Sequence, residues 1–232
     1  MNIGDRLEAI GNLVPQDSVL ADIGTDHAYL PVWLLQQGRI MKAIAGDIAE
    51  GPCLAARNTV AMYGMNDKVE IRLGSGLKVL KSGEANVIAI AGMGASTMID
   101  ILNEDMSLAQ EADTLILQPM AGAPSLRAWL CNHGWRLQDE ELVSEGKHLY
   151  EIIVAVRGTG DIYTRAVLEI GPVLIQKCHP LLQQQFEKVL TGYKKLLNGM
   201  AKSEHALASS KYAEYNKLVQ EVEELANDTY HK

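Results

Sequence analysis

The sequence predicts an α/β fold, a doubly wound and largely parallel sheet, followed by an α-helical extension. Short apolar runs alternate with helical patterns up to residue 156. One such run, Val19–Ala21, leads through Asp22 and Gly24 into a helix, which is the kind of turn where these sheets bind ligands. Beyond Gly158 the strand pattern stops and helical repeats replace it.

The predicted strands are short apolar or alternating runs bounded by glycine, proline or polar residues. Seven are expected, at residues 19–21, 42–47, 69–73, 87–91, 114–118, 137–143 and 150–156, the last two as an antiparallel pair. Helices are expected at residues 3–14, 29–38, 51–63 and 124–133, and another opens at Ser96. The turn Gly92–Gly94 should end the fourth strand, and Pro119 should end the fifth.

The helical extension is predicted from apolar residues that recur every three or four positions. Helices are expected at residues 168–200 and 212–225, with a polar connection at 202–210. Their apolar stripes contain Leu182, Phe186, Val189, Tyr193, Leu196 and Met200 in the first helix, and Tyr212, Tyr215, Val219, Val222 and Leu225 in the second. This pattern predicts an antiparallel, coiled-coil-like hairpin, so residues 1–158 and 159–232 are expected to form two domains.

Composition narrows the class of protein. Of the 232 residues, 47% are hydrophobic, which is typical of a globular chain. The first residues lack the apolar core of a secretory signal, and no apolar run approaches the roughly 20 residues that span a bilayer. The three cysteines are widely spaced, which favours a reducing compartment over a disulfide framework or a zinc site. We therefore expect a cytoplasmic protein with no membrane anchor and no metal.

The charge of the chain argues against non-specific nucleic-acid binding. The net charge is −8, and phosphate contacts dominate such binding. An RNA partner would need a local basic surface, for which Lys188, Lys194 and Lys195 in the extension are the candidates. The alternative is a solvated helix face balanced by glutamates, and charge alone favours that alternative.

The turn after the first strand indicates which ligand it binds. A dinucleotide site needs Gly-x-Gly-x-x-Gly, but here Asp26 takes the second glycine position. A carboxylate there repels a pyrophosphate and suits a cationic ligand without phosphate, such as S-adenosylmethionine. Taken alone, the turn is also compatible with an ordinary strand-to-helix connection.

The ends of the other strands extend the proposed cofactor site. Asp47 ends the second strand, 25 residues after Asp22, close to the spacing at which this fold places a carboxylate on ribose hydroxyls. Arg6, before the first strand, either reaches a ligand carboxylate or faces solvent. The full set of expected cofactor contacts is Arg6, Asp22, Gly24, Thr25, Asp26, His27, Asp47, Ile48, Gly74, Ser75, Gly76, Ala91 and Gly92.

Four stretches resemble the bacterial tRNA adenine-22 N1-methyltransferase family, the TrmK type. They are Ala21–Pro31 (ADIGTDHAYLP), Ile90–Gly94 (IAGMG), Leu115–Pro119 followed by Leu126–Leu130, and the late pair Tyr150-Glu151. The resemblance covers essentially the whole chain. It implies a class I methyltransferase, Rossmann-like sheet of seven strands, S-adenosylmethionine as methyl donor and tRNA as partner. The chain departs from the family pattern at Ser75, usually an acid or amide, and at Met120, usually asparagine.

The chemistry of the reaction can be argued from the residues as well. N1 of adenine is neutral at pH 7 and attacks a sulfonium methyl directly, so catalysis needs positioning and nearby negative charge more than a base. Asp26 is the expected electrostatic partner, while His27 is either an orienting group or an ordinary turn histidine. The base pocket is expected to consist of Gln118, Pro119 and the turn with Gly92 and Met93, although core packing is an alternative role for Met93 and Met120.

Three functions remain open at this point. The first is a monomeric tRNA adenine N1-methyltransferase. The second is a methyltransferase acting on another substrate, and the third is a non-catalytic binder of S-adenosylmethionine or tRNA.

Overall fold

The computed structural model describes residues 1–230 of the chain, which divide into two compact units. The first unit is Met1–Asp161, and the second begins at Ile162. In the described residues, no helix combines the length and the apolar character needed to cross a membrane.

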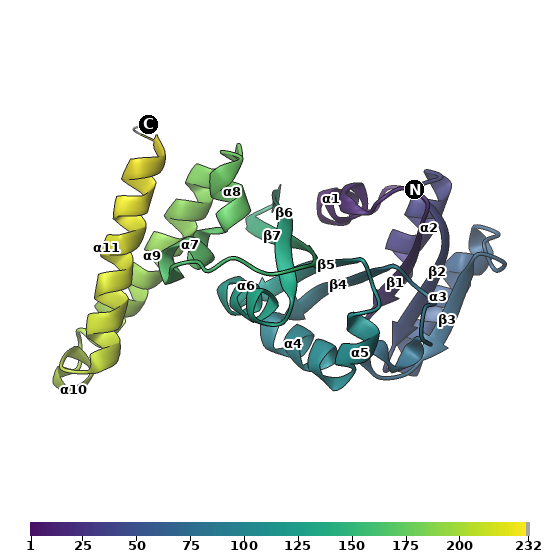
Figure 1. Ribbon diagram of the computed structural model, residues 1–232, viewed down its shortest axis with the longest axis horizontal. Helices are drawn as coiled ribbons and strands as arrows, with labels where there is room; N and C mark the ends of the chain where they lie inside the picture. Colours follow the sequence, from purple (N-terminus) through teal and green to yellow (C-terminus); the bar gives the residue numbers. More distant parts are fainter. Residues whose placement is uncertain (231–232) are drawn as a thin grey trace. The chain divides into compact units, whose positions relative to one another are not determined.

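The first unit contains a seven-stranded sheet with the order β3-β2-β1-β4-β5-β7-β6 (Figure 1). The strands are β1 (Ser18–Ile23), β2 (Ile40–Asp47), β3 (Val69–Leu73), β4 (Val87–Gly94), β5 (Thr114–Ala121), β6 (Trp135–Glu145) and β7 (His148–Arg157). Neighbouring strands from β3 to β5 are parallel, whereas β7 is antiparallel to β5 and β6. The predicted fold class and its final antiparallel pair are confirmed. Strand order reverses between β1 and β4, which places the ligand crevice at their carboxyl ends.

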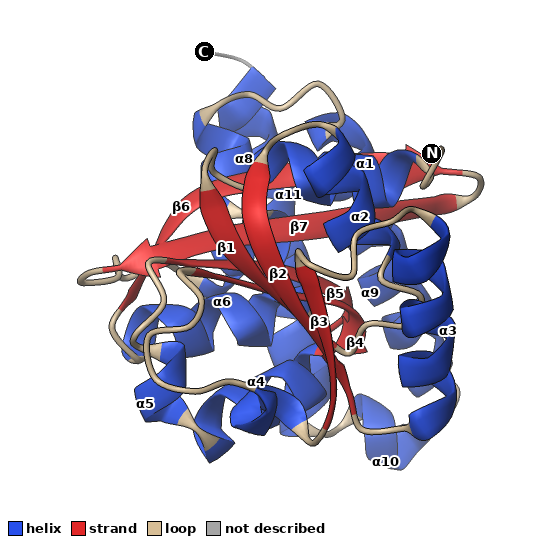
Figure 2. Cartoon of the chain, turned by 90° about the vertical axis from the view of Figure 1, so that its right-hand side faces the viewer, coloured by secondary structure: helices blue, strands red, loops and turns tan. Residues whose placement is uncertain are grey.

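Helices cover both faces of this sheet (Figure 2). They are α1 (Asp5–Leu13), α2 (Tyr29–Gln36), α3 (Glu50–Met62), α4 (Ala95–Glu104), α5 (Met106–Ala109) and α6 (Ala123–Asn132), with a short 3₁₀ turn η1 (Gly76–Val79). Helices α1 to α3 lie on one side of the sheet and α4 to α6 on the other. The helices at the ends of β1 and β2 therefore share the α1 side with the amino-terminal helix.

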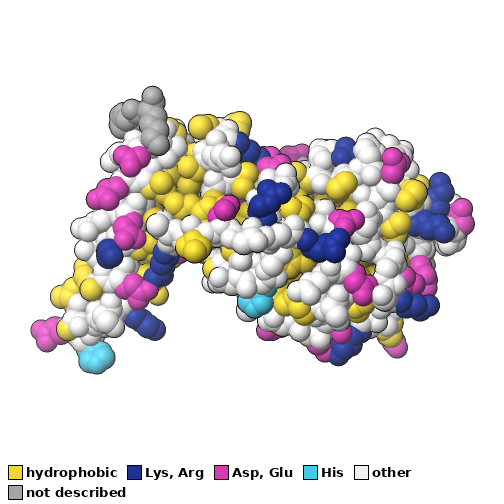
Figure 3. Space-filling view, viewed as in Figure 1, with side chains coloured by type: hydrophobic (Ala, Val, Ile, Leu, Met, Phe, Trp, Pro, Cys, Tyr) yellow, Lys and Arg dark blue, Asp and Glu magenta, His cyan; other side chains and the backbone are white. Residues whose placement is uncertain are grey.

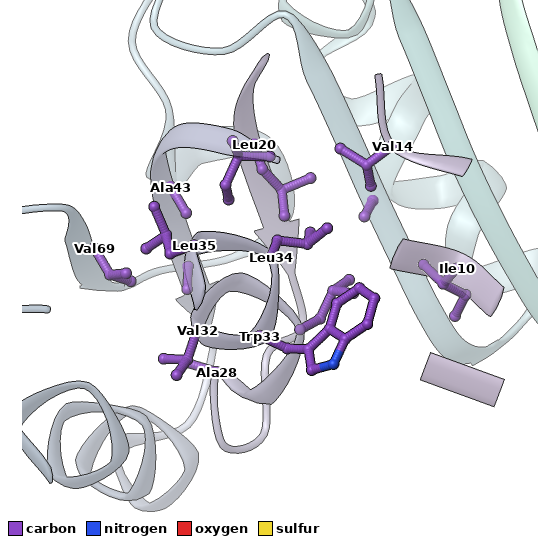
Figure 4. Close-up of a cluster of buried hydrophobic side chains, with 14 of the residues drawn as sticks. Ile10, Val14, Leu20, Ala28, Val32, Trp33, Leu34, Leu35, Ala43 and Val69 are labelled. Carbon is purple, nitrogen blue, oxygen red and sulfur yellow. The ribbon is translucent and has the colours of Figure 1, made fainter. Parts of the chain in front are cut away.

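The core on the α1 side fixes the position of that amino-terminal helix (Figure 4). Ile10 and Val14 are fully buried with Leu20 of β1 and Leu34 of α2. Gly11 lies against the ring of Trp33, so closely that a Cβ at residue 11 would be 2.6 Å from a ring carbon. Because α1 is packed this tightly on α2, residues earlier on α1 are held over the sheet.

Strands β4 and β5 each extend three residues beyond their predicted ends. Strand β4 continues to Gly94, because Gly92, with φ of 77°, forms a bulge after which pairing with β5 resumes at Met93. Strand β5 continues through Pro119 to Ala121. Its pairing with β7 ends at Leu117, so proline is tolerated where the strand has only one neighbour.

The second unit is helical throughout its regular structure. It contains α7 (Arg165–Ile170), α8 (Pro172–Gln176), α9 (Leu182–Met200), α10 (Glu204–Leu207) and α11 (Ser210–Tyr230). The single helix predicted at residues 168–200 is therefore wrong. Gly171, with φ of 115°, separates α7 from α8, and Cys178, with φ of 48°, separates α8 from α9. A continuous helix cannot contain residues with positive φ.

Helix α11 returns alongside α9 after the short α10 (Figure 1). The rings of Tyr193 and Tyr215 lie 5.6 Å apart between the two helices. One predicted stripe position is incorrect, since Leu196 is 43% exposed and Leu197 is buried instead. Buried Leu218, Val219 and Val222 supply the matching face of α11.

Candidate active site

The turn between β1 and α2 is built around Gly24. Its φ is 77°, and the amides of Gly24 and Thr25 both donate to the carbonyl of Gly46 at 2.8 and 3.0 Å. The side chain of Met93 lies directly against Gly24, where a Cβ would overlap its methyl group. The positive φ favours glycine at residue 24, and Met93, which is partly buried, closes the turn from the tip of β4.

A cavity of about 210 Å³, the Asp22 cavity, opens beside this turn. Its lining residues are Arg6, Leu7, Asp22, Gly24, Thr25, Asp26, His27, Ala28, Tyr29, Leu30 and Ala91. Seven of the residues predicted from the sequence to contact the cofactor are thus brought together around one space, including Arg6 from the amino-terminal helix. The cavity lies at the reversal in strand order, between the tips of β1 and β4.

The remaining predicted cofactor residues lie outside this cavity, five of them at the tips of β2 and β3 and the sixth, Gly92, on the bulge of β4. Asp47 accepts a hydrogen bond from the amide of Ala49 at 2.8 Å, and its carbonyl accepts from the amide of Gly74 at 2.9 Å. Ile48 is exposed, while Ser75 and Gly76 begin the η1 turn. A ligand bound in the Asp22 cavity can therefore extend along the tips of β2 and β3.

Asp22 is the buried acid of the cavity. Burial raises the pKa of its carboxyl from 3.8 to about 6, and repulsion from Asp47 adds to this rise. A hydrogen bond from the side chain of Thr25 acts in the opposite direction. A ligand cation beside Asp22 stabilises the ionised carboxylate, because the positive charge compensates for the hydration that burial removes.

Asp26 and His27 form the outer edge of the cavity. Their side chains are 77% and 41% exposed, and Asp26 Oδ2 lies 3.4 Å from His27 Nε2. The imidazole stacks on the ring of Tyr29, with centroids 5.0 Å apart and planes 8° apart. Tyr29, 42% exposed, is not among the site residues expected from the sequence.

Gln118, predicted to contact the acceptor base, is fully buried. Its Oε1 accepts hydrogen bonds from Arg6 Nη1 at 2.6 Å and from the amide of Gly92 at 3.2 Å. Its Nε2 donates to the carbonyl of Pro119 at 3.1 Å. The amide is therefore engaged by neighbouring protein groups, whereas the sequence predicts that Gln118 forms part of the base pocket.

The residues that surround Gln118 differ in their exposure to solvent. Met120 is exposed, so core packing is wrong as its alternative role. Pro119 is buried, and Gly92 is exposed on the bulge of β4. The guanidinium carbon of Arg6 lies 5.5 Å from the ring centre of Tyr150, which belongs to the family resemblance but is not among the site residues expected from the sequence.

A buried ion cluster braces the sheet beneath these tips. Arg127 of α6 donates to Glu140 of β6 at 2.5 Å and to Glu151 of β7 at 2.9 Å. Arg127 and Glu140 are fully buried, and the neighbouring carboxylates raise the pKa of Arg127 against the opposing effect of burial. The cluster ties α6 to the strand that carries Tyr150.

The three predicted RNA-binding lysines differ in their surroundings. Lys194 and Lys195 line an open groove of about 570 Å³ on α9, together with Lys202, whereas Lys188 is not among its lining residues. Lys194 also pairs with Glu223 of α11 at 2.5 Å. No group of His, Cys, Asp and Glu suited to a metal ion occurs within residues 1–230.

Comparisons with known proteins cover the whole of this site. A family model described as a methyltransferase domain matches residues 3–153. The tRNA (adenine(22)-N(1))-methyltransferase of Bacillus subtilis (strain 168) is 35% identical over 195 residues, which is 82% of each chain.

Solved structures of tRNA methyltransferases are also similar to this chain. The Bacillus subtilis m1A22 tRNA methyltransferase TrmK is 30% identical with a TM-score of 0.85, over 98% of each chain. Streptococcus pneumoniae Sp1610, solved in complex with S-adenosyl-L-methionine, is 31% identical with a TM-score of 0.82, over 97% of this chain and 99% of the other.

Proposed function

Because the chain belongs to the family of bacterial tRNA (adenine-22-N1)-methyltransferases, we propose that it methylates N1 of adenine 22 in tRNA. The methyl donor is S-adenosyl-L-methionine. The observation that carries the proposal is the pair of carboxylates at this turn, Asp22 and Asp26, the second of which takes the place of a dinucleotide-site glycine.

The chemistry of the residues fits this cofactor, which supplies a methyl group on a cationic sulfur. Asp22 and Asp26 offer negative charge beside the cavity. Asp47, at the tip of β2, offers carboxylate oxygens for a ribose. Exposed Ile48 and Leu73, at the ends of β2 and β3, offer apolar contact for a base. The guanidinium of Arg6 forms no ion pair with a carboxylate within residues 1–230, so it is available to a ligand carboxylate.

On the acceptor side, the residues of the chain position a nucleophile that needs no base. Adenine N1 carries a lone pair at neutral pH, and positive charge develops on the adenine as the methyl group arrives. Asp26 lies at the open edge of the cavity, where its charge stabilises that developing cation. Tyr29, stacked on His27 at the same edge, offers an aromatic surface to a base extruded from the folded tRNA.

The helical unit is proposed to hold the tRNA, and the unit containing the sheet is proposed to perform catalysis. Lys194, Lys195 and Lys202 supply the positive charge of the α9 groove. On the face shown in Figure 3, basic side chains of this unit lie among acidic ones, which limits any non-specific attraction for RNA. A monomer in the cytoplasm would be sufficient for this function.

Labelled methyl transfer into unmodified tRNA, followed by nucleoside analysis, tests the proposal. The expected product is N1-methyladenosine, and a tRNA with position 22 changed should not be labelled. Transfer to a different substrate would support the second function, a methyltransferase with another acceptor. Cofactor binding without any transfer would support the third, a binder without catalysis.

A further inference from the structure

The side chains of Arg6 and Gln118 connect two elements that are 112 residues apart in the chain. Arg6 lies on α1, which the Gly11–Trp33 contact holds in place, and Gln118 lies near the tip of β5. The bond joins a charged donor to a fully buried acceptor at 2.6 Å, and charge-assisted bonds of this kind are the stronger class. Tyr150 lies against the same guanidinium and limits its freedom.

Gln118 transmits this restraint to the tip of β4. The oxygen that accepts from Arg6 also accepts from the amide of Gly92, the bulged residue with φ of 77°. The orientation of the Gln118 amide therefore determines where the backbone of Gly92 lies. Gly92 is exposed between the Asp22 cavity and the tip of β5, so its position shapes the surface on which an acceptor base would rest.

Arg6 contacts both the Asp22 cavity and Gln118. It lines the Asp22 cavity, yet one of its nitrogens is already engaged by Gln118. A guanidinium carries five N–H donors, so it can bond a ligand carboxylate in the cavity and keep its bond to Gln118. A ligand in the cavity would thus remove the remaining freedom of the same side chain that orients Gln118.

We propose that Arg6 and Gln118 are positioning residues that couple occupancy of the cofactor cavity to binding of the acceptor base. Cofactor in the cavity orders Arg6, Arg6 orients Gln118, and Gln118 holds the Gly92 bulge in its base-binding position. The inference rests on the proposed function and specifies its binding order: tRNA binds more tightly once the cavity is filled.

Binding of an unmodified tRNA transcript to the full-length protein tests this coupling without any methyl transfer. Affinity is measured by fluorescence titration, with and without saturating S-adenosylhomocysteine. For the wild type, we expect S-adenosylhomocysteine to tighten tRNA binding by at least about fivefold, the lower end of typical coupling between sites. In Gln118→Met, which keeps side-chain length but removes the amide, the ratio should fall to about one.

Further variants separate coupling from loss of structure. Gln118→Glu keeps acceptor oxygens for Arg6 and Gly92 and should retain most of the coupling, even if Gln118→Met folds poorly. Arg6→Lys should lose the coupling and also bind S-adenosylhomocysteine more weakly. The control is the exposed pair Arg136 and Gln138 on β6, also joined at 2.6 Å, and Arg136→Lys or Gln138→Met should leave the coupling unchanged.

The outcomes are distinct from those that test the proposed function. If the wild type binds tRNA equally with and without S-adenosylhomocysteine, or if Gln118→Met and Arg6→Lys keep the wild-type ratio, the coupling is overturned while methyl transfer stands. If the wild type binds no tRNA under either condition, the proposed function and the coupling both fail.

Discussion

The buried carboxylate of Asp22 accepts a hydrogen bond from the side chain of Thr25, three residues further along the same turn. The hydroxyl oxygen of Thr25 in turn accepts from the amide of Ala28 at 3.1 Å, just before α2 begins. The acid of the cavity is thus part of the connection that starts the helix. Its ionisation consequently affects both the stability of the fold and the binding of a cationic ligand.

Asp22 should make the cofactor-free protein less stable as pH rises. Its pKa is about 6 in the folded protein against 3.8 in the reference state, so the folded state binds more protons between these values. The protonated acid therefore stabilises the fold below pH 4, and this contribution, about 3 kcal/mol, is lost as pH rises through 6. Asp22→Asn should unfold at a higher temperature than the wild type at pH 7.5, with the difference shrinking toward pH 4.5, as followed by thermal melts.

Asp22→Asn should also weaken cofactor binding. The wild-type affinity for S-adenosylmethionine should increase as pH rises through about 6, because the ionised Asp22 favours a cation, whereas Asp22→Asn should lack this dependence. Calorimetric titrations at pH 5.5 and 7.5 measure it. Equal pH dependence in the two proteins would show that Asp22 does not act on the ligand.

Asp47 should contribute to cofactor binding with little effect on folding. Asp47→Asn keeps an oxygen for the amide of Ala49 but removes the negative charge at the tip of β2. Loss of charge-assisted hydrogen bonds predicts weaker S-adenosylmethionine binding by roughly 1–3 kcal/mol, measured by calorimetry. Unchanged affinity in a variant with a wild-type melting temperature would remove Asp47 from the site.

Asp26 should matter more for turnover than for cofactor affinity. Asp26→Asn keeps the shape of the exposed side chain and removes the charge that the proposed mechanism assigns to stabilising the adenine cation. We expect a turnover loss of about 10²-fold or more, the scale for removing a preorganised electrostatic partner, with a smaller change in cofactor affinity. Single-turnover methyl transfer and calorimetry together measure the two quantities.

Two variants define the limits of that prediction. Asp67→Asn, an exposed acid in the loop before β3, should behave as wild type. His27→Ala should cost less than Asp26→Asn, since the acceptor nitrogen needs no base. Complete loss of turnover in His27→Ala, with cofactor binding intact, would contradict this mechanism.

Lys195 and Lys202 should carry part of the salt dependence of tRNA binding. Both line the α9 groove, and neither pairs with a carboxylate in the described residues. Replacing both with alanine should reduce the slope of log affinity against log salt by about one per lost phosphate contact. Titrations at several salt concentrations measure the slope. Lys42→Ala, at the start of β2, is the control, and equal slopes in both variants would remove the groove from the RNA interface.

Most of the sheet is predictable from the sequence because its signals are local. Apolar runs bounded by glycine or polar residues identify the seven strands. Because parallel strands have their carboxyl ends at the same edge of the sheet, Asp22, Asp47 and Gly74 are expected to lie there together. The errors occur where neighbours override local signals. Gly92 and Pro119 lie within strands because β4 and β5 continue to pair with each other after the pairing of β5 with β7 has ended. The helix prediction failed at Gly171, because a stripe of apolar residues does not reveal a positive φ.

Local residue patterns specify which kinds of residue lie at the strand tips, and hence the class of ligand that they suit. The direction in which those side chains point depends on how the elements pack together. Gln118 lies in the predicted place, but its amide is directed inward by Arg6 and Gly92, and Arg6 is placed by the packing of α1 on α2. Such contacts join segments far apart in the chain, and their geometry depends on how whole elements pack, which no local pattern of residues encodes.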